Sequence, residues 1–308
     1  MGRDKFWAIV VTLIAPSIWG SSYIIFTQTL PIDHPLLVAA LRALPAGIIL
    51  MLLGPGLPPR DKLIALMTLG VLNIGLFFGL LFFAASRLPG GLAATLSATQ
   101  PLIVAFLAWP LLGKAPQPIQ IGAGVAGLIG VGLLILDPTA QLDALGMLAA
   151  LAGAGAMAVG TVLISRWGKL GSPMGVAAWQ LTFGGILLLP LALVVEGMAP
   201  VPTALNWVGL SYLVLVGTAF AYWIFIRGIG KLGPDAAFLG FFSPLTATLL
   251  GAIFLGEWFN GWQWLGIALI LAATFVGVAV GRGKSAAPQD LPRGVGGTTS
   301  TPHERHNL

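Results

Sequence analysis

The stretch that decides the fold is residues 209–277, which read GLSYLVLVGTAFAYWIFIRGIGKLGPDAAFLGFFSPLTATLLGAIFLGEWFNGWQWLGIALILAATFVG. It contains three apolar spans of about twenty residues each, separated only by the segments IRGIGKLGPD and GEWFNGWQ. A helix rises about 1.5 Å per residue and the hydrocarbon core of a bilayer is about 30 Å thick, so about 20 residues can cross it. We therefore expect three membrane-spanning helices here, with Pro244 in the middle of the second.

The composition extends this expectation to the whole chain. Of its 308 residues, 57% are hydrophobic and only 8% are charged, whereas soluble domains carry about 25% charged residues. A soluble globular fold is therefore excluded, and the chain is predicted to be an all-α, multi-pass membrane protein. It contains no cysteine, which excludes a disulfide framework, a thiolate metal site and a cysteine nucleophile.

Charge-poor spans recur along most of the chain. They are unbroken apolar runs rather than alternating strands of about ten residues, so helices are favoured over a membrane barrel. The first span follows Arg3 and Lys5 as a signal peptide would, but it is too long and lacks a clear cleavage site, so we interpret it as the first helix. Ten helices are expected, near residues 6–30, 36–54, 63–86, 90–112, 118–136, 144–165, 173–195, 205–227, 234–255 and 261–281.

The basic residues lie in alternate loops. A net charge of +5 would favour nucleic acid as the partner of a soluble protein, but this distribution favours the lipid bilayer instead. The loops on one side contain a single basic residue, Arg87. Because Lys and Arg resist translocation, the other side is expected to be the cytoplasm, with both termini there and the chain in the cell (inner) membrane. The residues on that side are Arg3, Lys5, Arg60, Lys62, Lys114, Arg166, Lys169, Arg227, Lys231, Arg282, Lys284, Arg293 and Arg305.

The two halves of the chain resemble each other weakly. Two copies of a five-helix unit would insert in opposite orientations because five is odd, which gives the inverted repeat of many secondary transporters. We expect repeats at 1–137 and 138–282 and a disordered cytoplasmic tail at 283–308. The alternative is chance similarity between apolar segments. The matched pairs are Pro35 with Pro173, Arg42 with Gln180, Leu88 with Leu232, Pro101 with Pro244, Gly113 with Gly256, and Gln120 with Gln263.

Several strings resemble a known family in their order and spacing. They are PSIWGSSY, which contains Trp19, then LRALPAG, which contains Arg42, and in the second half GTAFAYWIFIRGIGKLGPDAA and SPLTATLLGAIFLGEW. Over nearly the whole chain they resemble the drug/metabolite transporter superfamily, in its EamA-like ten-helix branch. The resemblance implies an exporter or exchanger of small metabolites, with ten helices around a central cavity and access that alternates between the two sides. Aromatic or neutral amino acids are among the substrates that it implies.

One departure from the family pattern concerns the ends of the fourth and ninth helices. The family often has Gly-Glu at both, whereas this chain has Gly113-Lys114 and Gly256-Glu257. By the expected topology Lys114 lies inside and Glu257 outside, which agrees with the sided preference for positive charge. A function for a matched pair of glutamates is therefore not expected.

The sequence also indicates where a cavity would lie. Pro101 and Pro244 occupy matched positions, and each removes a backbone donor, which in lipid is tolerated beside protein or a water-filled cavity. Both are candidate hinge or cavity-lining residues, although prolines also kink membrane helices for packing alone. Further side chains within the spans are Ser21, Ser97, Thr99, Met157, Thr161, Thr218 and Thr246. The candidate substrate-binding residues are Trp19, Tyr23, Asn73, Phe77, Phe78, Gln100, Tyr222 and Ser243.

Helical spacing supports this choice, since Asn73 and Phe77 are four residues apart and should share a face, as should Thr218 and Tyr222. Aromatic walls with a few amide or hydroxyl groups suit a neutral or zwitterionic compound with an apolar side chain. Single Ser, Thr or aromatic residues can equally serve packing. Arg42 is the one formal charge well inside a span, and two roles stay open for it: binding a carboxylate, or a structural role, with snorkelling to the outer interface within its reach.

Absent residue types narrow the function further. No Asp, Glu or His lies near the middle of any span, which disfavours the proton-coupled efflux of cationic drugs. An integral-membrane enzyme is disfavoured for the same reason, and no metal site, cofactor or phosphate-binding loop is indicated. The sequence therefore predicts a secondary transporter that exports amino acids or related neutral, hydrophobic metabolites. Cationic-drug efflux is the alternative within transport, and a membrane enzyme is the alternative of another class.

Overall fold

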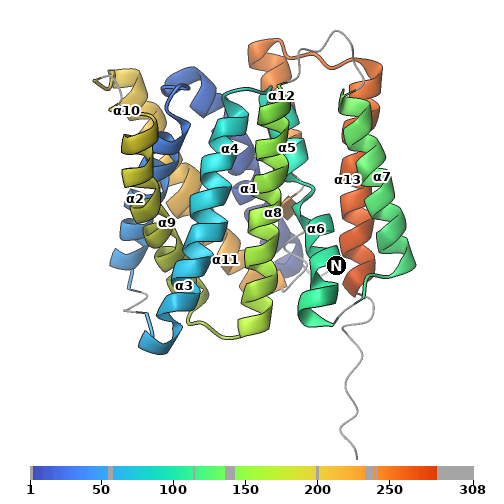
Figure 1. Cartoon of the computed structure of the whole chain (residues 1–308), viewed down its shortest axis with the longest axis horizontal. Helices are drawn as coiled ribbons and strands as arrows, with labels where there is room; N and C mark the ends of the chain where they lie inside the picture. The colour runs from blue at the N-terminus through green and yellow to red at the C-terminus, as the bar shows by residue number, and fades with distance from the viewer. Residues whose placement is uncertain are drawn as a thin grey trace, which may run out of the picture.

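The computed structural model describes residues 3–54, 58–113, 115–135, 143–198, 201–232, 239–240 and 242–282. All regular elements in these ranges are helical. The expected tail at 283–308, the boundary between residues 137 and 138, and Lys114 lie outside the described residues. The start of α1 and the end of α13 both lie in the lower half of the molecule in Figure 1.

Along the chain, the described helices lie in or close to the predicted spans, in the same order. The α-helices are α1 (Arg3–Thr29), α2 (Pro35–Leu52), α3 (Leu63–Leu69), α4 (Phe77–Ala85), α5 (Gly90–Ser97), α6 (Gln100–Leu112), α7 (Pro118–Ile135), α8 (Ala144–Trp167), α9 (Pro173–Val195), α10 (Ala204–Ser211), α11 (Ala221–Leu232), α12 (Phe242–Leu250) and α13 (Gly261–Arg282). Three segments are π-helical: η2 (Gly70–Leu76), η3 (Tyr212–Phe220) and η5 (Gly251–Leu255). A short 3-10 helix, η1 (Arg60–Lys62), precedes α3.

Seven helical stretches within the described residues are long and apolar enough to cross a membrane. Three shorter apolar stretches, Pro118–Gly130, Phe242–Leu255 and Gly261–Ala273, fall in the remaining predicted spans. The seven are Trp7–Thr29, Pro35–Leu52, Arg60–Ala85, Gly90–Leu112, Ala144–Trp167, Pro173–Val195 and Ala204–Phe225. Within the described residues the chain is all-helical, as predicted, and its helices are consistent with a membrane protein.

Local chemistry explains where several helices begin and end. Asp143 caps α8, because its carboxylate accepts a hydrogen bond from the backbone N–H of Gly146 at 2.7 Å. Ser172 caps α9 in the same way through Gly175. Gly113 ends α6 at φ 69° and Gly256 ends η5 at φ 66°. This left-handed conformation stops a helix and favours glycine, so it gives a physical reason for the glycines at both positions.

The span predicted at 90–112 is not one continuous helix. It is interrupted after Ser97 and resumes as α6 at Gln100, with Pro101 in the first turn of α6. Proline fits a first turn because no intrahelical partner exists there for its missing N–H. Pro244 likewise lies in the first turn of α12. Both prolines therefore mark the start of a helical segment rather than a kink within one.

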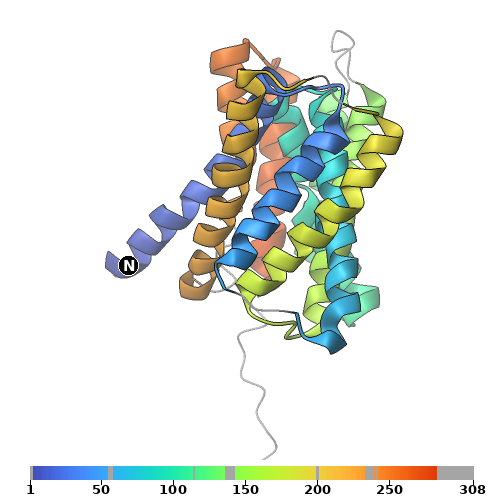
Figure 2. The same cartoon turned by 90° about the vertical axis from the view of Figure 1, so that its left-hand side faces the viewer.

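Close packing of small residues joins helices from the two halves (Figures 1 and 2). α2 packs on α9, where a Cβ on Gly47 would meet the backbone nitrogen of Thr182 at 2.7 Å, and one on Gly185 would meet that of Leu44 at 2.7 Å. The residue order runs in opposite directions, so the two helices are antiparallel. α5 packs on α12, and α7 on α13. Small residues allow such backbone approach in a membrane, where lipid gives no hydrophobic drive between helices.

Candidate functional site

A cavity of about 200 Å³ lies between the two halves. Helices α1, α2, α4, α5 and α6 contribute to its wall from the first half, and α8, α11 and α12 from the second. We call it the central cavity. It is lined by Trp19, Tyr23, Arg42, Phe77, Phe78, Leu81, Ala94, Ser97, Ala98, Gln100, Met157, Tyr222, Gly240, Ser243 and Pro244.

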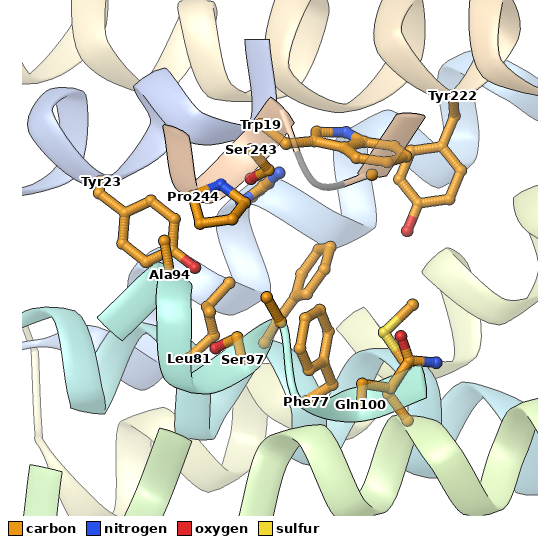
Figure 3. Close-up of a pocket in the computed structure, with 15 residues that line it drawn as sticks. Trp19, Tyr23, Phe77, Leu81, Ala94, Ser97, Gln100, Tyr222, Ser243 and Pro244 are labelled. Atoms are coloured by element: carbon orange, nitrogen blue, oxygen red, sulfur yellow. The ribbon is translucent and has the colours of Figure 1, made fainter. Parts of the chain in front are cut away.

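Aromatic rings form much of this wall. Trp19 on α1 meets Tyr222 on α11 edge-on, with ring centroids 5.6 Å apart and planes at 62°. Phe77 and Phe78, adjacent on α4, have centroids 5.8 Å apart. Figure 3 shows Trp19 and Tyr222 on one side of the space and Phe77 on the other. A flat apolar group would therefore meet rings from both halves of the chain.

Arg42 is the charged residue of the lining and is almost fully buried, with 3% of its surface exposed. Its Nε donates to Thr218 Oγ1 at 2.8 Å, and its Nη2 donates to the Gly217 carbonyl at 3.1 Å. Both acceptors belong to the π-helix η3. Arg42 is thus held inside the bundle and does not extend to the outer interface, which was within its reach.

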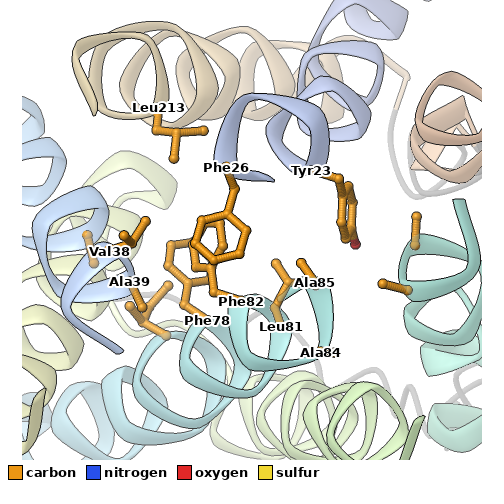
Figure 4. Packing of buried hydrophobic residues seen from close by; sticks show 14 of the residues in the cluster. Tyr23, Phe26, Val38, Ala39, Phe78, Leu81, Phe82, Ala84, Ala85 and Leu213 are labelled. Atoms are coloured by element: carbon orange, nitrogen blue, oxygen red, sulfur yellow. The ribbon is translucent and has the colours of Figure 1, made fainter. Parts of the chain in front are cut away.

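Two phenylalanine rings support the Arg42 guanidinium. Its central carbon lies 4.6 Å from the centroid of Phe78 and 5.5 Å from that of Phe82. Phe82 packs in turn on Phe26, with centroids 4.8 Å apart, in the hydrophobic core of Figure 4. Cation–π contact strengthens as water is excluded. The guanidinium of Arg42 is therefore held in place by packed aromatic rings.

Few polar groups other than Arg42 reach the cavity wall. Gln100 donates from Nε2 to Thr161 Oγ1 at 3.1 Å, and Ser97 donates to the Ala93 carbonyl at 2.9 Å. The indole N–H of Trp19 is buried and has no hydrogen-bond partner within the described residues. A buried donor without a partner costs free energy.

Most of the predicted site residues meet in this cavity. The structure brings together Trp19, Tyr23, Arg42, Phe77, Phe78, Gln100, Tyr222, Ser243 and Pro244. Pro101 lies beside them in the chain, in the first turn of α6, and its side chain is outside the described part.

Asn73 is not among the lining residues. Its Nδ2 donates to Gln180 Oε1 at 2.8 Å, and its Oδ1 packs against Gly160. Asn73 lies in the π-helix η2 and Phe77 begins α4, and both pack against α8, at Gly160 and Gly153 respectively. Thr218, in η3, accepts a hydrogen bond from Arg42, and Tyr222 lines the same cavity as Arg42. In this structure Asn73 thus contacts α8 and α9 and lies outside the cavity lining.

Sequence reasoning missed four residues of the lining: Leu81, Ala94, Ala98 and Gly240. Leu81 follows Phe77 by one helical turn, and Ala98 follows Ala94 by the same interval. This helical spacing was the sequence signal that could have identified Leu81 and Ala98 as lining residues. Apolar side chains of this size are so common in membrane helices that the spacing alone does not distinguish them.

Glu257 lies at one end of the cavity helices, just after η5. Its carboxyl group faces the backbone N–H groups of Gly90 and Gly91, the first residues of α5. Burial raises the pKa of Glu257 above its usual value, against the lowering by these two N–H groups. Glu257 therefore accepts hydrogen bonds from the first N–H groups of α5. This role does not depend on a matching glutamate at the end of the fourth predicted helix.

The part of the lining that the structure describes contains no acidic residue and no histidine. Among the described residues, no group of three or more His, Cys, Asp or Glu could hold a metal ion.

Comparisons with known proteins agree with this architecture. The sequence profile of the EamA-like transporter family matches the chain twice, over residues 6–136 and 144–278. Protein PecM of Dickeya dadantii is 43% identical over 268 residues, which cover 85% of this chain and 89% of that protein. The inner membrane transporter YedA of Escherichia coli (strain K12) is 28% identical over 262 residues, covering 83% and 85%. A protein of known crystal structure, 21% identical, superposes with a TM-score of 0.64 over 90% of this chain and 99% of its own, which indicates a shared fold.

Proposed function

This chain belongs to the EamA-like transporter family and is a multi-pass membrane transporter rather than an enzyme, and on that premise we propose what it moves and how. The substrate is a small neutral or zwitterionic metabolite with an apolar side chain, such as an amino acid or a related compound. It crosses the membrane through the central cavity and is exported. The observation that carries this proposal is a cavity whose described lining has aromatic walls, one guanidinium and no carboxylate.

The size and polarity of the cavity support a substrate of this class. Its volume of about 200 Å³ suits a small metabolite better than a drug-sized molecule. Arg42 would attract a carboxylate, and the unpaired N–H of Trp19 would donate to the same group or to a carbonyl. The apolar side chain would then lie between Phe77 and Tyr222, so all these residues are proposed substrate contacts.

The efflux of cationic drugs is less well supported. A cation in the central cavity would lie near the Arg42 guanidinium, and the lining offers no carboxylate to offset that repulsion. Aromatic faces alone attract cations, but only by about 0.5–2 kcal/mol for each contact. The charge in the wall therefore favours the non-cationic class.

The two halves are proposed to be inverted five-helix repeats, divided near residue 137. The family profile matches once in each half. Helices at corresponding positions, α2 with α9, α5 with α12, and α7 with α13, lie against each other. The contacts of Gly47 with Thr182 and of Leu44 with Gly185 exchange under the alignment that matches Arg42 with Gln180. An approximate two-fold axis in the membrane plane would produce this exchange.

Alternating access follows from the same arrangement. The interruption between α5 and α6 and the segment before α12 both lie on the cavity wall, through Ala98 and Gly240. Short breaks in membrane helices are tolerated where they face a cavity, and they allow the flanking segments to move apart. We propose that rocking about these two breaks opens the cavity to one side at a time.

The proposed location is the cell (inner) membrane, with both termini in the cytoplasm. The basic residues of the α2–α3 and α8–α9 connections lie at the same end of the bundle, the lower end in Figure 1. This sided distribution supports a cytoplasmic lower end.

Transport by purified protein in liposomes tests the function. Liposomes are loaded with neutral amino acids, nucleosides or organic cations, and efflux down the gradient is measured. Neutral, aromatic or aliphatic amino acids are expected to leave faster than from empty liposomes, and organic cations are not. Efflux of organic cations or nucleosides without efflux of amino acids would overturn the proposed substrate class.

A further inference from the structure

A second and larger hollow lies away from the central cavity, between α4, α9 and the start of α2. Its volume is about 670 Å³, and it shares no lining residue with the central cavity. We call it the lateral groove. It extends from Asp33, Arg87 and Glu196 at one end to Gly75 and Leu187 at the other.

The length of the lateral groove matches one half of a bilayer. On α9 its lining runs from Leu187 to Glu196, and on the opposite wall from Gly75 to Arg87. At about 1.5 Å per residue these distances are roughly 14 and 18 Å, and half of the hydrocarbon core is about 15 Å thick. The groove is therefore as deep as the layer that a single acyl chain occupies.

The walls of the groove are apolar and open. Leu76, Leu187 and Leu191 line it with 45%, 42% and 45% of their surface exposed. Gly75 and Gly79, about one helical turn apart, have no side chain and so leave space along this wall of the groove. A Cβ on Gly79 would meet only the flexible tip of Leu36, at 3.0 Å, or that of Leu188 at 3.5 Å. A larger side chain at Gly79 would therefore enter the groove.

The mouth of the groove carries charges of both signs. Arg87 pairs with Asp143 at 2.8 Å and lies over the ring of Phe83 at 4.6 Å. Both carboxylate oxygens of Glu196 accept hydrogen bonds from the first N–H groups of α2, those of Leu36 and Leu37, at 2.7 and 3.0 Å. Asp33 is exposed and forms no ion pair with any described residue. The mouth thus offers one uncommitted carboxylate near one partly exposed guanidinium.

We propose that the lateral groove binds one zwitterionic phospholipid with a primary ammonium headgroup. An acyl chain lies between α4 and α9, the ammonium contacts Asp33, and the phosphate contacts the free N–H groups of Arg87. An anionic headgroup fits less well, because it would meet Asp33 and Glu196 beside a guanidinium that Asp143 already neutralises. The site rests on the membrane location of the chain and not on the transported substrate.

Native mass spectrometry of the full-length protein tests the proposal. Purified, delipidated protein is mixed with phosphatidylethanolamine, phosphatidylglycerol or phosphatidylcholine that carry the same acyl chains. One phosphatidylethanolamine per chain is expected, with a preference of about fivefold over phosphatidylglycerol, the size of one partly screened ion pair. Gly79→Leu should abolish this binding, and Asp33→Asn should abolish the headgroup preference.

Matched controls separate the groove from general lipid adhesion. Gly122→Leu adds the same side chain to α7 where no atom lies within 4 Å of the new Cβ, and Asp61→Asn removes an exposed carboxylate outside the groove. Both should bind lipid as the unchanged protein does. Equal retention by Gly79→Leu and Gly122→Leu would overturn the site. Equal binding of phosphatidylglycerol would overturn the headgroup assignment, and a dimer that Gly79→Leu dissociates would make the groove a protein interface.

A second measurement uses the unchanged protein, so it does not depend on whether a variant folds. Phosphatidylethanolamine with a photoreactive group in its acyl chain is cross-linked to the unchanged protein in liposomes, and the labelled peptides are identified. Labels concentrated on η2, α4 and α9 support the proposal. Labels spread evenly over the lipid-facing helices, α7 included, contradict it.

Discussion

Arg42 on α2 and Gln180 on α9 make comparable contacts in the two halves of the molecule. Arg42 donates to Gly217 and Thr218 in the π-helix η3, whereas Gln180 accepts from Asn73 in the π-helix η2. Aligning Leu88 with Leu232 matches Asn73 with Gly217, so the two contacts correspond under the proposed repeat. Both side chains are buried, at 3% and 7% exposure.

The difference between the two contacts lies in what else each side chain reaches. Arg42 also lines the central cavity and rests on Phe78, whereas Gln180 is not part of the lining. In both halves a buried polar side chain bonds a π-helical segment, and only in the first half does that side chain also carry a charge into the lining of the central cavity. Loss of either contact should thus weaken the fold, but only loss of Arg42 should weaken transport by folded protein.

The largest expected effect is that of Arg42→Gln, which gives the first half the side chain of its counterpart. Transport per folded protein should fall about tenfold to hundredfold, because a hydrogen bond to a charged group contributes about 1.5–3 kcal/mol. Arg42→Lys keeps the charge without the planar fork and should retain an intermediate rate. Efflux from liposomes, normalised to the monodisperse fraction, measures this. A loss of transport no greater than the loss of folded protein would make Arg42 a packing residue like Gln180.

The next effect is on the fold. Asn73→Ala and Gln180→Ala each leave a buried partner unpaired, which should lower stability by about 1–3 kcal/mol. Transport per folded protein should stay close to that of the unchanged chain. Thermal unfolding in detergent and efflux from liposomes, measured on the same preparations, separate the two quantities. A large loss of transport with unchanged unfolding temperature would return Asn73 to the substrate site.

Substitutions in the aromatic wall of the central cavity should reduce transport by the folded protein more than they reduce its stability. Trp19→Ala and Tyr222→Ala each remove a ring that faces the cavity and should lower transport per folded protein about tenfold, the value of roughly 1.4 kcal/mol of binding. Trp109→Ala is the matched control, since Trp109 is 60% exposed on α6 and does not line the cavity. Equal effects of Trp19→Ala and Trp109→Ala would contradict the aromatic wall as a substrate contact.

The smallest effect concerns the ion pair between the halves, where Arg87 follows α4 and Asp143 precedes α8. The N–H of Gly146 and then the Arg87 side chain hold the pKa of Asp143 below its usual value. A lowered pKa in the folded protein means that the stabilisation is present above the unfolded pKa, about 4, and is lost as the pH falls through the lower folded pKa. Asp143→Asn should therefore unfold slightly more readily at neutral pH, and the difference should begin to shrink below about pH 4 and vanish once the pH lies below the folded pKa. A difference that persists or grows on acidification would contradict this assignment.

The sequence was sufficient to predict features that one residue or one short segment determines. The apolar spans, the helix ends at Gly113 and Gly256, and the cavity position of Pro244 all follow from local chemistry. The hydrogen bond of Asn73 to Gln180 was not predicted, because it depends on how η2 packs against α9. The partners of Arg42 were not predictable either, since they lie on η3, far along the chain, and depend on how α2 packs against it.

The central claim is that substrate passes through the cavity between the two halves, and one measurement tests it directly. The chain has no cysteine, so Ala98→Cys on the cavity wall introduces a single thiol, and Ser165→Cys introduces one at an exposed position outside the cavity. The rate of modification by a water-soluble thiol reagent is measured with and without a transported amino acid, followed by transport activity. We predict that the amino acid slows modification of Ala98→Cys but not of Ser165→Cys, and that only the modified Ala98→Cys protein stops transporting. Modification of Ala98→Cys that neither responds to the amino acid nor blocks transport would contradict the account.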